Sequence, residues 1–194
     1  MTNNKKQIGL LFGSFNPIHI GHLLIAEGVL NSGLVDEVWM VVSPHNPFKS
    51  TEDLAPEIDR LAMVDIAIAD NPKIKLCDIE LYLPKPSYTY FTLENLYQKY
   101  PQFDFRLLMG EDNLSKFHHW REFETILKNA SPIVYPRPGA EKGPLHSHPN
   151  ITLLNMPLMD ISATYIRDII KDKKSLKYLL NEKVADYIIE KKIF

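Results

Sequence analysis

Two histidines stand three residues apart where a helix is expected to begin. They end the segment Gly13-Ser14-Phe15-Asn16-Pro17-Ile18-His19-Ile20-Gly21-His22, which follows a short apolar run. Residues three apart share one face of a helix, so the imidazoles of His19 and His22 project together. Gly13 allows a tight turn with exposed N–H groups, and the helix dipole adds positive potential. The segment therefore predicts a site for a polyphosphate anion.

The alternative interpretation is that one histidine caps the helix and the other is a half-buried side chain with satisfied hydrogen bonds. A lone histidine would favour this interpretation. Two on one face, after a Gly/Pro turn at the carboxyl end of a strand, favour a functional site instead.

A second candidate segment, Asp160-Ile161-Ser162-Ala163-Thr164-Tyr165-Ile166-Arg167, lies near the end of the chain. Ser162 is suited to cap a helix. Thr164 and Arg167 then share a face, and a guanidinium clamps a phosphate with two hydrogen bonds. Alone, the segment favours the alternative interpretation, an ordinary capped helix with a solvated arginine.

Both segments resemble motifs of the nucleotidyltransferase superfamily. The first matches Gly-x-Phe-x-Pro-x-His-x-Gly-His at every fixed position, and the second resembles Ile-Ser-x-Thr-x-Ile-Arg, whose implied role is to hold the β and γ phosphates of ATP. His-Ile-Gly-His also occurs in class I aminoacyl-tRNA synthetases. This chain is short for a synthetase, and Lys171-Asp172-Lys173-Lys174-Ser175 matches their Lys-Met-Ser-Lys-Ser segment poorly.

The middle of the chain resembles bacterial nicotinate-nucleotide adenylyltransferases. The segments that carry this resemblance are Pro86-Ser87-Tyr88-Thr89, Gly110-Glu111-Asp112, Trp120 with Phe123–Leu127, and Arg137-Pro138-Gly139. The resemblance runs from Ile8 to the last helix. It implies that ATP and nicotinate mononucleotide give nicotinate adenine dinucleotide and pyrophosphate, in NAD biosynthesis.

Residue by residue, the resemblance assigns the catalytic role to His19 and His22. Its ATP contacts fall on Gly13, Ser14, Phe15, Gly21, Gly110, Asp112, Arg137, Ser162, Thr164 and Arg167. Its acceptor contacts fall on Asn16, Lys49, Tyr88, Thr89, Trp120 and Arg121. It also implies Mg²⁺ held by substrate phosphates and water, with no ligand from the protein.

These residue types suit a pyridine nucleotide. Trp120 offers a flat face to a nicotinate ring, and Thr89, with backbone amides near Tyr88 and Arg121, offers donors to its carboxylate. The alternatives are a core tryptophan and, for Asp112, a helix N-terminal acid in place of a ribose contact.

The chain departs from the family pattern at two positions. Phe48 stands where the family usually has histidine, although the neighbouring Lys49 keeps the positive charge. Leu83 stands where the family often has a basic residue. These departures leave open which residues hold the acceptor phosphate.

The elements that must position these residues alternate between strand and helix, which predicts an α/β fold with a Rossmann-like, doubly wound parallel sheet. Residues 1–194 are expected to form one nucleotidyltransferase domain, with a small helical region from about Ser162. The helix over residues 56–70 is expected to bury Ile58, Leu61, Ala62, Ile66 and Ala69. The expected strands are 8–12, 38–42, 73–76, 103–109, 133–135 and 151–154, the other helices are 21–31, 89–100 and a stretch ending near 129, and residues 135–150 are expected to form a surface loop.

Composition limits the function classes. The formal net charge is −2, from 22 basic and 24 acidic residues, so bulk charge does not favour nucleic acid or an anionic membrane. The single Cys77 excludes an intramolecular disulfide and a cysteine zinc cage. No signal peptide or membrane span is evident, and we expect a cytoplasmic protein. The oligomeric state stays open.

Rival functions remain at this point. One is an adenylyltransferase of the same superfamily that uses nicotinamide mononucleotide or phosphopantetheine. Another is a nucleotide-binding regulator without catalysis, and an RNA-binding module is disfavoured by charge.

Overall fold

A six-stranded parallel sheet forms the centre of the computed structural model, which describes residues 5–44 and 54–194. Its strand order is β3-β2-β1-β4-β5-β6, so the order reverses between β1 and β4. This is the doubly wound α/β arrangement predicted from the alternation of elements. The strands are β1 Lys6–Gly13, β2 Glu37–Val42, β3 Ile74–Cys77, β4 Phe103–Gly110, β5 Ile133–Tyr135 and β6 Thr152–Leu153.

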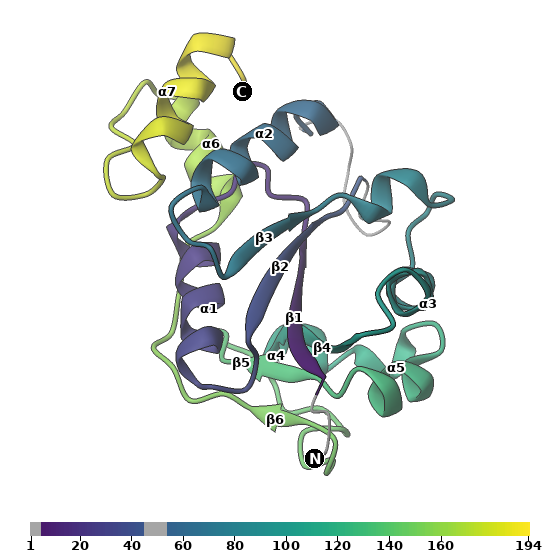
Figure 1. Ribbon diagram of the computed structural model, residues 1–194. Helices are drawn as coiled ribbons and strands as arrows, with labels where there is room; N and C mark the ends of the chain where they lie inside the picture. The colour runs from purple at the N-terminus through teal and green to yellow at the C-terminus, as the bar shows by residue number, and fades with distance from the viewer. Residues whose placement is uncertain (1–4, 45–53) are drawn as a thin grey trace.

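Helices cover both faces of the sheet (Figure 1). One face carries α1 Ile20–Asn31, α2 Glu57–Ile68, α6 Ala163–Lys171 and α7 Glu182–Lys191. The other carries α3 Thr89–Lys99 and α5 Phe123–Asn129. Short helical turns are η1 Ile79–Tyr82, α4 Glu111–Leu114 and η2 Phe117–His119. The helical stretch expected to end near Asn129 is thus divided among α4, η2 and α5.

The central strand β1 is buried on both sides because helices lie over both faces. Ile8 and Leu10 pack into the core on the α3 side, whereas Leu11 packs on the α1 side. This alternation follows from the two-residue period of a strand. It explains why β1 is a continuous apolar run rather than an alternating one.

The buried face of α2 differs from the one predicted. Ile58 is 71% exposed, and Ala69 is also exposed and lies beyond the end of the helix. The buried residues are Arg60, Met63, Val64, Ala67 and Ile68. Leu61 and Ile66 are partly buried against the core, so the prediction is wrong at Ile58 and Ala69 and not at these two positions. Arg60 was missed in the buried stripe because a hydrophobic pattern assigns charged residues to solvent.

The C-terminal region packs on the same face as α1 and α2. Val184 and Ile188 of α7 join the core on this side, and the Tyr187 hydroxyl donates to the Asp59 carboxylate of α2 at 2.8 Å. The backbone N–H of Ile20, at the start of α1, donates to the Leu179 carbonyl at 3.0 Å. The C-terminal helices therefore support the segment that holds the two histidines.

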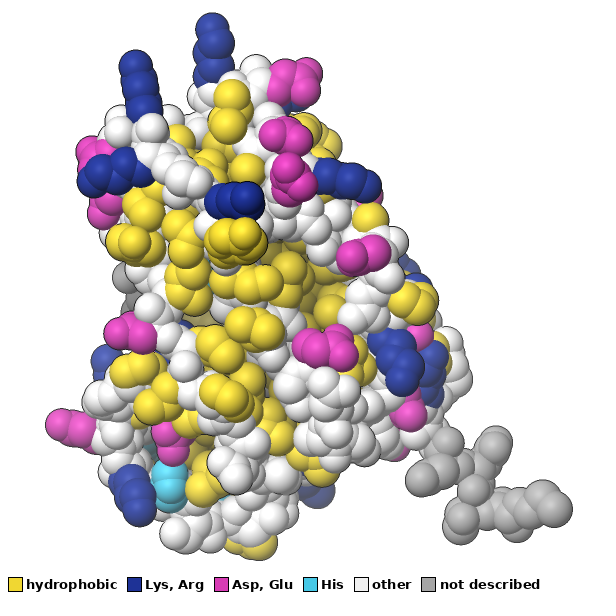
Figure 2. Space-filling view, turned by 90° about the vertical axis from the view of Figure 1, so that its left-hand side faces the viewer, with side chains coloured by type: hydrophobic (Ala, Val, Ile, Leu, Met, Phe, Trp, Pro, Cys, Tyr) yellow, Lys and Arg dark blue, Asp and Glu magenta, His cyan; other side chains and the backbone are white. Residues whose placement is uncertain are grey.

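Hydrophobic side chains gather across the middle of the face that presents α1 and the C-terminal helices (Figure 2). Met156 and Ile161, from the segment before α6, are partly buried and pack against the core on the α1 side of the sheet. Residues 136–151 contain no helix or strand, as expected for a surface loop. Within residues 5–44 and 54–194, every helix is too short or too polar to cross a bilayer.

The observed burial of α2 can be tested by a pair of substitutions. Met63→Ala removes a fully buried side chain and should lower the free energy of unfolding by about 2–5 kcal/mol. Ile58→Ala should change it by no more than about 0.5 kcal/mol, because the side chain is exposed. Urea denaturation measures both, and a larger loss for Ile58→Ala would contradict the observed face of the helix.

Candidate active site

The predicted phosphate site lies where β1 ends and α1 begins, next to the point at which the strand order reverses. His19 is the N-cap residue of α1 and His22 lies in its first turn. Their ring centroids are 3.7 Å apart, so the predicted pairing of the imidazoles is observed. The His19 backbone N–H donates to Nδ1 of His22 at 3.2 Å. Because this Nδ1 accepts, the ring proton of His22 lies on Nε2.

His19 is buried in a positive environment. Its side chain is 6% exposed, and its Nδ1 has no hydrogen-bond partner among the described residues. Burial, followed by the charge of Arg137, lowers the pKa of His19 from 6.5 to about 4. The imidazole is therefore neutral near pH 7 and carries one N–H and one unprotonated nitrogen.

The turn between β1 and α1 is built around Phe15. Its side chain is 1% exposed and packs against His22, with ring centroids 5.0 Å apart, while its backbone φ is +46°. A Cβ on Gly13 would lie 2.9 Å from the Phe15 ring. Glycine at position 13 thus makes room for the aromatic ring, and only the backbone of Phe15 is available for the predicted ATP contact.

The two motifs from opposite ends of the chain meet at this turn. Nη1 of Arg167 donates to the backbone carbonyl of Asn16 at 3.0 Å, and its Nη2 donates to Thr164 Oγ1 at 3.4 Å. Ser162 caps α6 as predicted, because its Oγ accepts from the Tyr165 N–H at 3.2 Å. Arg167 is therefore not a solvated arginine of an ordinary capped helix.

Gly21 also joins the two motifs. A Cβ at this position would collide with Ile161 and would lie 3.0 Å from His19 Nδ1. The absence of a side chain lets the segment before α6 approach the start of α1. Close packing therefore requires glycine at this position, and its predicted ATP contact stays a prediction.

A third group of predicted residues gathers after β4 and β5. Asp112 Oδ1 and Arg137 Nε are 3.8 Å apart, and a Cβ on Gly110 would collide with Asp112 and crowd Arg137. Arg137 also donates to the Met159 carbonyl at 3.4 Å. Asp112 lies in the first turn of α4. It is therefore a helix N-terminal acid, which was the alternative to a ribose contact, and it also forms this ion pair.

The predicted acceptor residues surround the start of α3. Tyr88 is its N-cap residue and Thr89 its first residue. The Arg121 guanidinium lies over the rings of Tyr88 and Phe91, 5.3 and 4.9 Å from their centroids. Trp120 is half-buried and packs edge-on against Phe117 at 5.4 Å. The tryptophan is therefore partly accessible rather than a fully buried core residue.

Comparison with known proteins agrees with this geometry. The model of the cytidylyltransferase-like family matches residues 10–169. A protein of Cytophaga hutchinsonii named "Probable nicotinate-nucleotide adenylyltransferase" is 50% identical over 188 residues, covering 97% of this chain and 98% of the relative. The chain belongs to the nicotinate-nucleotide adenylyltransferase family.

Other relatives and structures support this assignment. A Flavobacterium johnsoniae relative of the same name is 49% identical over 184 residues, covering 94% of this chain and 95% of the relative. The solved structure of Plasmodium falciparum nicotinic acid mononucleotide adenylyltransferase complexed with NaAD has a TM-score of 0.80 and 24% identity, and covers 97% of both chains. The latter likeness concerns the fold.

The most buried charged side chain near the site was missed in the sequence. Arg60 of α2 is 1% exposed and donates to four backbone carbonyls, those of Ser14, Ser43, Pro44 and Ala55. Glu80 of η1 is 2% exposed and accepts from Thr92 Oγ1 at 2.7 Å. The only signal for Arg60 was its position in a stripe with Met63, Val64 and Ala67.

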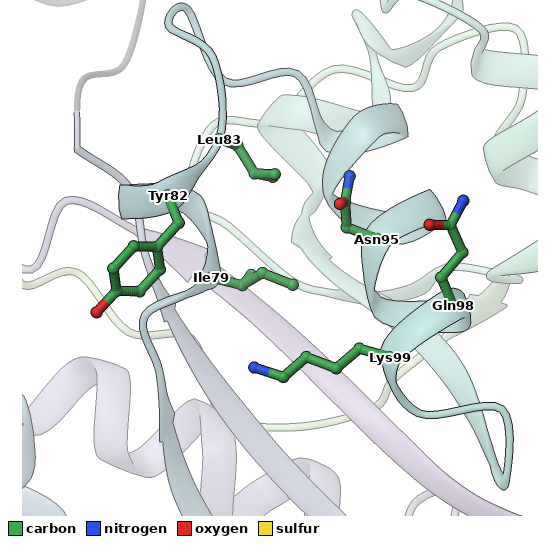
Figure 3. A pocket seen from close by; sticks show the side chains of 6 residues that line it. All are labelled: Ile79, Tyr82, Leu83, Asn95, Gln98 and Lys99. Atoms are coloured by element: carbon green, nitrogen blue, oxygen red, sulfur yellow. The ribbon is translucent and has the colours of Figure 1, made fainter.

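Three positions that were singled out in the sequence of this adenylyltransferase family member are not among the residues observed around the histidine pair. Lys49 and Phe48 lie outside the described residues. Leu83 lines a cleft of 470 Å³ between η1 and α3, separate from the histidine pair (Figure 3). Among residues 5–44 and 54–194, no three histidine, cysteine, aspartate or glutamate side chains form a group suited to hold a metal ion.

The lowered pKa of His19 predicts acid sensitivity. The pKa of the His19 imidazole is 6.5 in the unfolded chain and about 4 in the folded chain. The stability that depends on a neutral His19 is therefore fully present above pH 6.5 and is lost as the pH falls toward 4. From about pH 7 to about pH 5 this loss is about 2 kcal/mol. His19→Gln should remove it from the pH dependence of urea denaturation.

The exposed His119 provides the control, since His119→Gln keeps the buried imidazole and should keep this loss. Equal pH dependence in the wild-type and His19→Gln proteins would contradict the burial of a neutral imidazole.

Proposed function

We propose that this chain transfers the adenylyl group of ATP to nicotinate mononucleotide and releases pyrophosphate. The observation that carries the proposal is the hydrogen bond from Arg167 to the Asn16 carbonyl. It brings a phosphate-clamping arginine against the loop that leads to the histidine pair. The relatives' printed name, nicotinate-nucleotide adenylyltransferase, supports the same reaction.

On the ATP side, we assign the histidine pair to the α phosphate. His22 would donate from Nε2 to an α-phosphate oxygen, and the buried His19 would provide a second polar contact beside it. Ser162, Thr164 and Arg167 would hold the departing pyrophosphate at the start of α6. The surrounding positions assigned to ATP are Gly13, Ser14, Phe15, Gly21, Gly110, Asp112 and Arg137.

On the acceptor side, we assign the pyridine ring to the partly exposed face of Trp120. Thr89 and the backbone near Tyr88 begin a helix, where free N–H groups favour a carboxylate. Arg121 lies over Tyr88 and adds positive charge at the same place. Asn16 and Lys49 complete the assigned acceptor contacts.

The reaction joins a phosphate oxygen of the mononucleotide to the α phosphorus of ATP. The bond between the α phosphorus and the bridging oxygen to the β phosphorus breaks, and pyrophosphate leaves with that oxygen and its electron pair. The attacking phosphate is already largely ionised near pH 7, so no general base is required. The protein contributes alignment and positive groups around the α phosphorus.

We further propose that Mg²⁺ enters as the complex with ATP. Because the described residues offer no three-ligand carboxylate or histidine group, substrate phosphate oxygens and water would hold the ion. When bound, the ion would neutralise charge on the leaving pyrophosphate.

We propose that residues 1–194 act as one nucleotidyltransferase domain. ATP and the mononucleotide are charged and do not cross membranes unaided, which supports a cytoplasmic location. A net charge of −2 gives no support for a nucleic-acid or membrane partner.

Pyrophosphate release from Mg-ATP tests the function. Nicotinate mononucleotide, nicotinamide mononucleotide and phosphopantetheine would be compared as acceptors at equal concentration, and we expect the first to give the highest kcat/KM. Preference for either of the others would identify a different member of the superfamily. ATP binding without release on any acceptor would indicate a non-catalytic nucleotide-binding protein.

His22→Ala should lower kcat by about a hundredfold, because it removes one preorganised donor to the α phosphate. The dissociation constant for ATP, measured by calorimetry, should change much less. His148→Ala, in the loop before β6, serves as the control with unchanged turnover. Near-normal kcat for His22→Ala would remove this residue from the catalytic role.

Trp120→Ala should raise the KM for nicotinate mononucleotide by about fivefold to a hundredfold, the equivalent of losing one base stack. The KM for ATP should stay close to the wild-type value, and Trp120→Phe should recover most of the loss. If both KM values rise equally, Trp120 does not belong to the acceptor site.

A further inference from the structure

Arg60 is a buried cation that contacts two loops of the candidate site at once. Its Nη1 donates to the carbonyls of Ser14 at 2.8 Å and Ser43 at 2.7 Å. Its Nη2 donates to Pro44 at 3.0 Å, and its Nε donates to Ala55 at 3.1 Å. The guanidinium therefore joins the residue that follows β1 to the two residues that follow β2.

The joined loops carry residues assigned to different substrates. Ser14 begins the turn that leads to the histidine pair, which we assign to ATP. Ser43 begins the connection from β2 toward α2, and its side chain leads through Glu80 and Thr92 to the start of α3, where Tyr88 and Thr89 are assigned to the acceptor. The N–H of Ala55, at the end of this connection, donates to Asn16 Oδ1 at 2.9 Å.

The same network reaches the start of α3. The Ser43 side chain hydrogen-bonds to the buried Glu80, which also accepts from Thr92 Oγ1 at 2.7 Å. Thr92 Oγ1 lies 3.3 Å from the Tyr88 carbonyl. A chain of buried polar contacts thus runs from Arg60 through Ser43 and Glu80 to the N-cap residue of α3.

The charged side chain of Arg60 pairs buried carbonyls from separate loops. Removing a guanidinium from water is costly, and the four partners of Arg60 are neutral carbonyls. An apolar side chain of similar volume would avoid that cost but would leave the four carbonyls without these donors. Arg60 does provide five donors in a planar fork, which one lysine ammonium cannot reproduce.

We propose that Arg60 is a positioning residue for adenylyl transfer. It sets the position of the turn after β1, where the assigned ATP contacts begin, relative to Ser43 and, through Glu80, relative to the start of α3, where the assigned acceptor contacts lie. This inference rests on the proposed function. Its physical basis is that one rigid group hydrogen-bonds both loops, so their separation is defined by its geometry. A misplacement of about 1 Å between reacting groups costs about a hundredfold in rate.

Arg60→Lys tests the proposal, because it retains the charge and loses the fork. Arg106→Lys is the matched control. Arg106 is half-buried and bridges the Ser131 carbonyl at 2.7 Å and Thr152 Oγ1 at 3.3 Å, ahead of β5 and at the start of β6. Calorimetric titration with a non-hydrolysable ATP analogue would count the folded sites in each preparation.

We expect Arg60→Lys to lower kcat per folded site by about a hundredfold at saturating substrates, with the separate dissociation constants of ATP analogue and mononucleotide changed less than about threefold. Arg106→Lys should keep the wild-type kcat per folded site. Equal kcat per folded site in the two variants would overturn the proposal. Absence of turnover in the wild-type protein would instead contradict the proposed function.

A second variant covers the case in which Arg60→Lys does not fold. Arg60→Ala would be purified with guanidinium ion at a non-denaturing concentration, since the ion fits the space vacated by the side chain. Turnover per folded site should rise with guanidinium and not with methylammonium, which has no planar fork. Turnover that is independent of guanidinium would overturn the positioning role.

Discussion

The site depends on how the irregular turn between β1 and α1 is held, because arginine side chains bind two of its backbone carbonyls, those of Ser14 and Asn16. Buried backbone groups need partners, and here two arginines from distant parts of the chain provide them. Arg60 of α2 binds the Ser14 carbonyl, and Arg167 of α6 binds the Asn16 carbonyl. The turn is therefore held by α2 and by the C-terminal region as well as by the sheet.

The electrostatics of the site follow from the same packing. The chain is nearly neutral as a whole, yet Arg137 and Arg167 are concentrated around the start of α1, where the helix dipole is also positive. Burial keeps His19 neutral in this setting, so His19 offers hydrogen bonds rather than further charge. Such a site suits a polyphosphate, whose binding requires a local group of donors and not a basic protein.

The fold and the pairing of the two histidines could be predicted from the sequence, because each is indicated by a pattern within a short segment. Apolar runs with helical stretches between them predicted the parallel sheet, and the spacing of His19 and His22 predicted their pairing. Arg60 could not be found in this way, since its partners are up to 46 residues away and a charged residue on a helix normally faces water. The contact between Arg167 and Asn16 spans 151 residues, so the sequence predicted both motifs but not their hydrogen bond.

The most direct test of this account is a crystal structure with nicotinate adenine dinucleotide bound. We predict that its pyrophosphate lies at the start of α1, within hydrogen-bond distance of His22, with the nicotinate ring against Trp120 and the four carbonyl contacts of Arg60 intact. A dinucleotide bound away from α1, for example in the cleft between η1 and α3, would contradict the account.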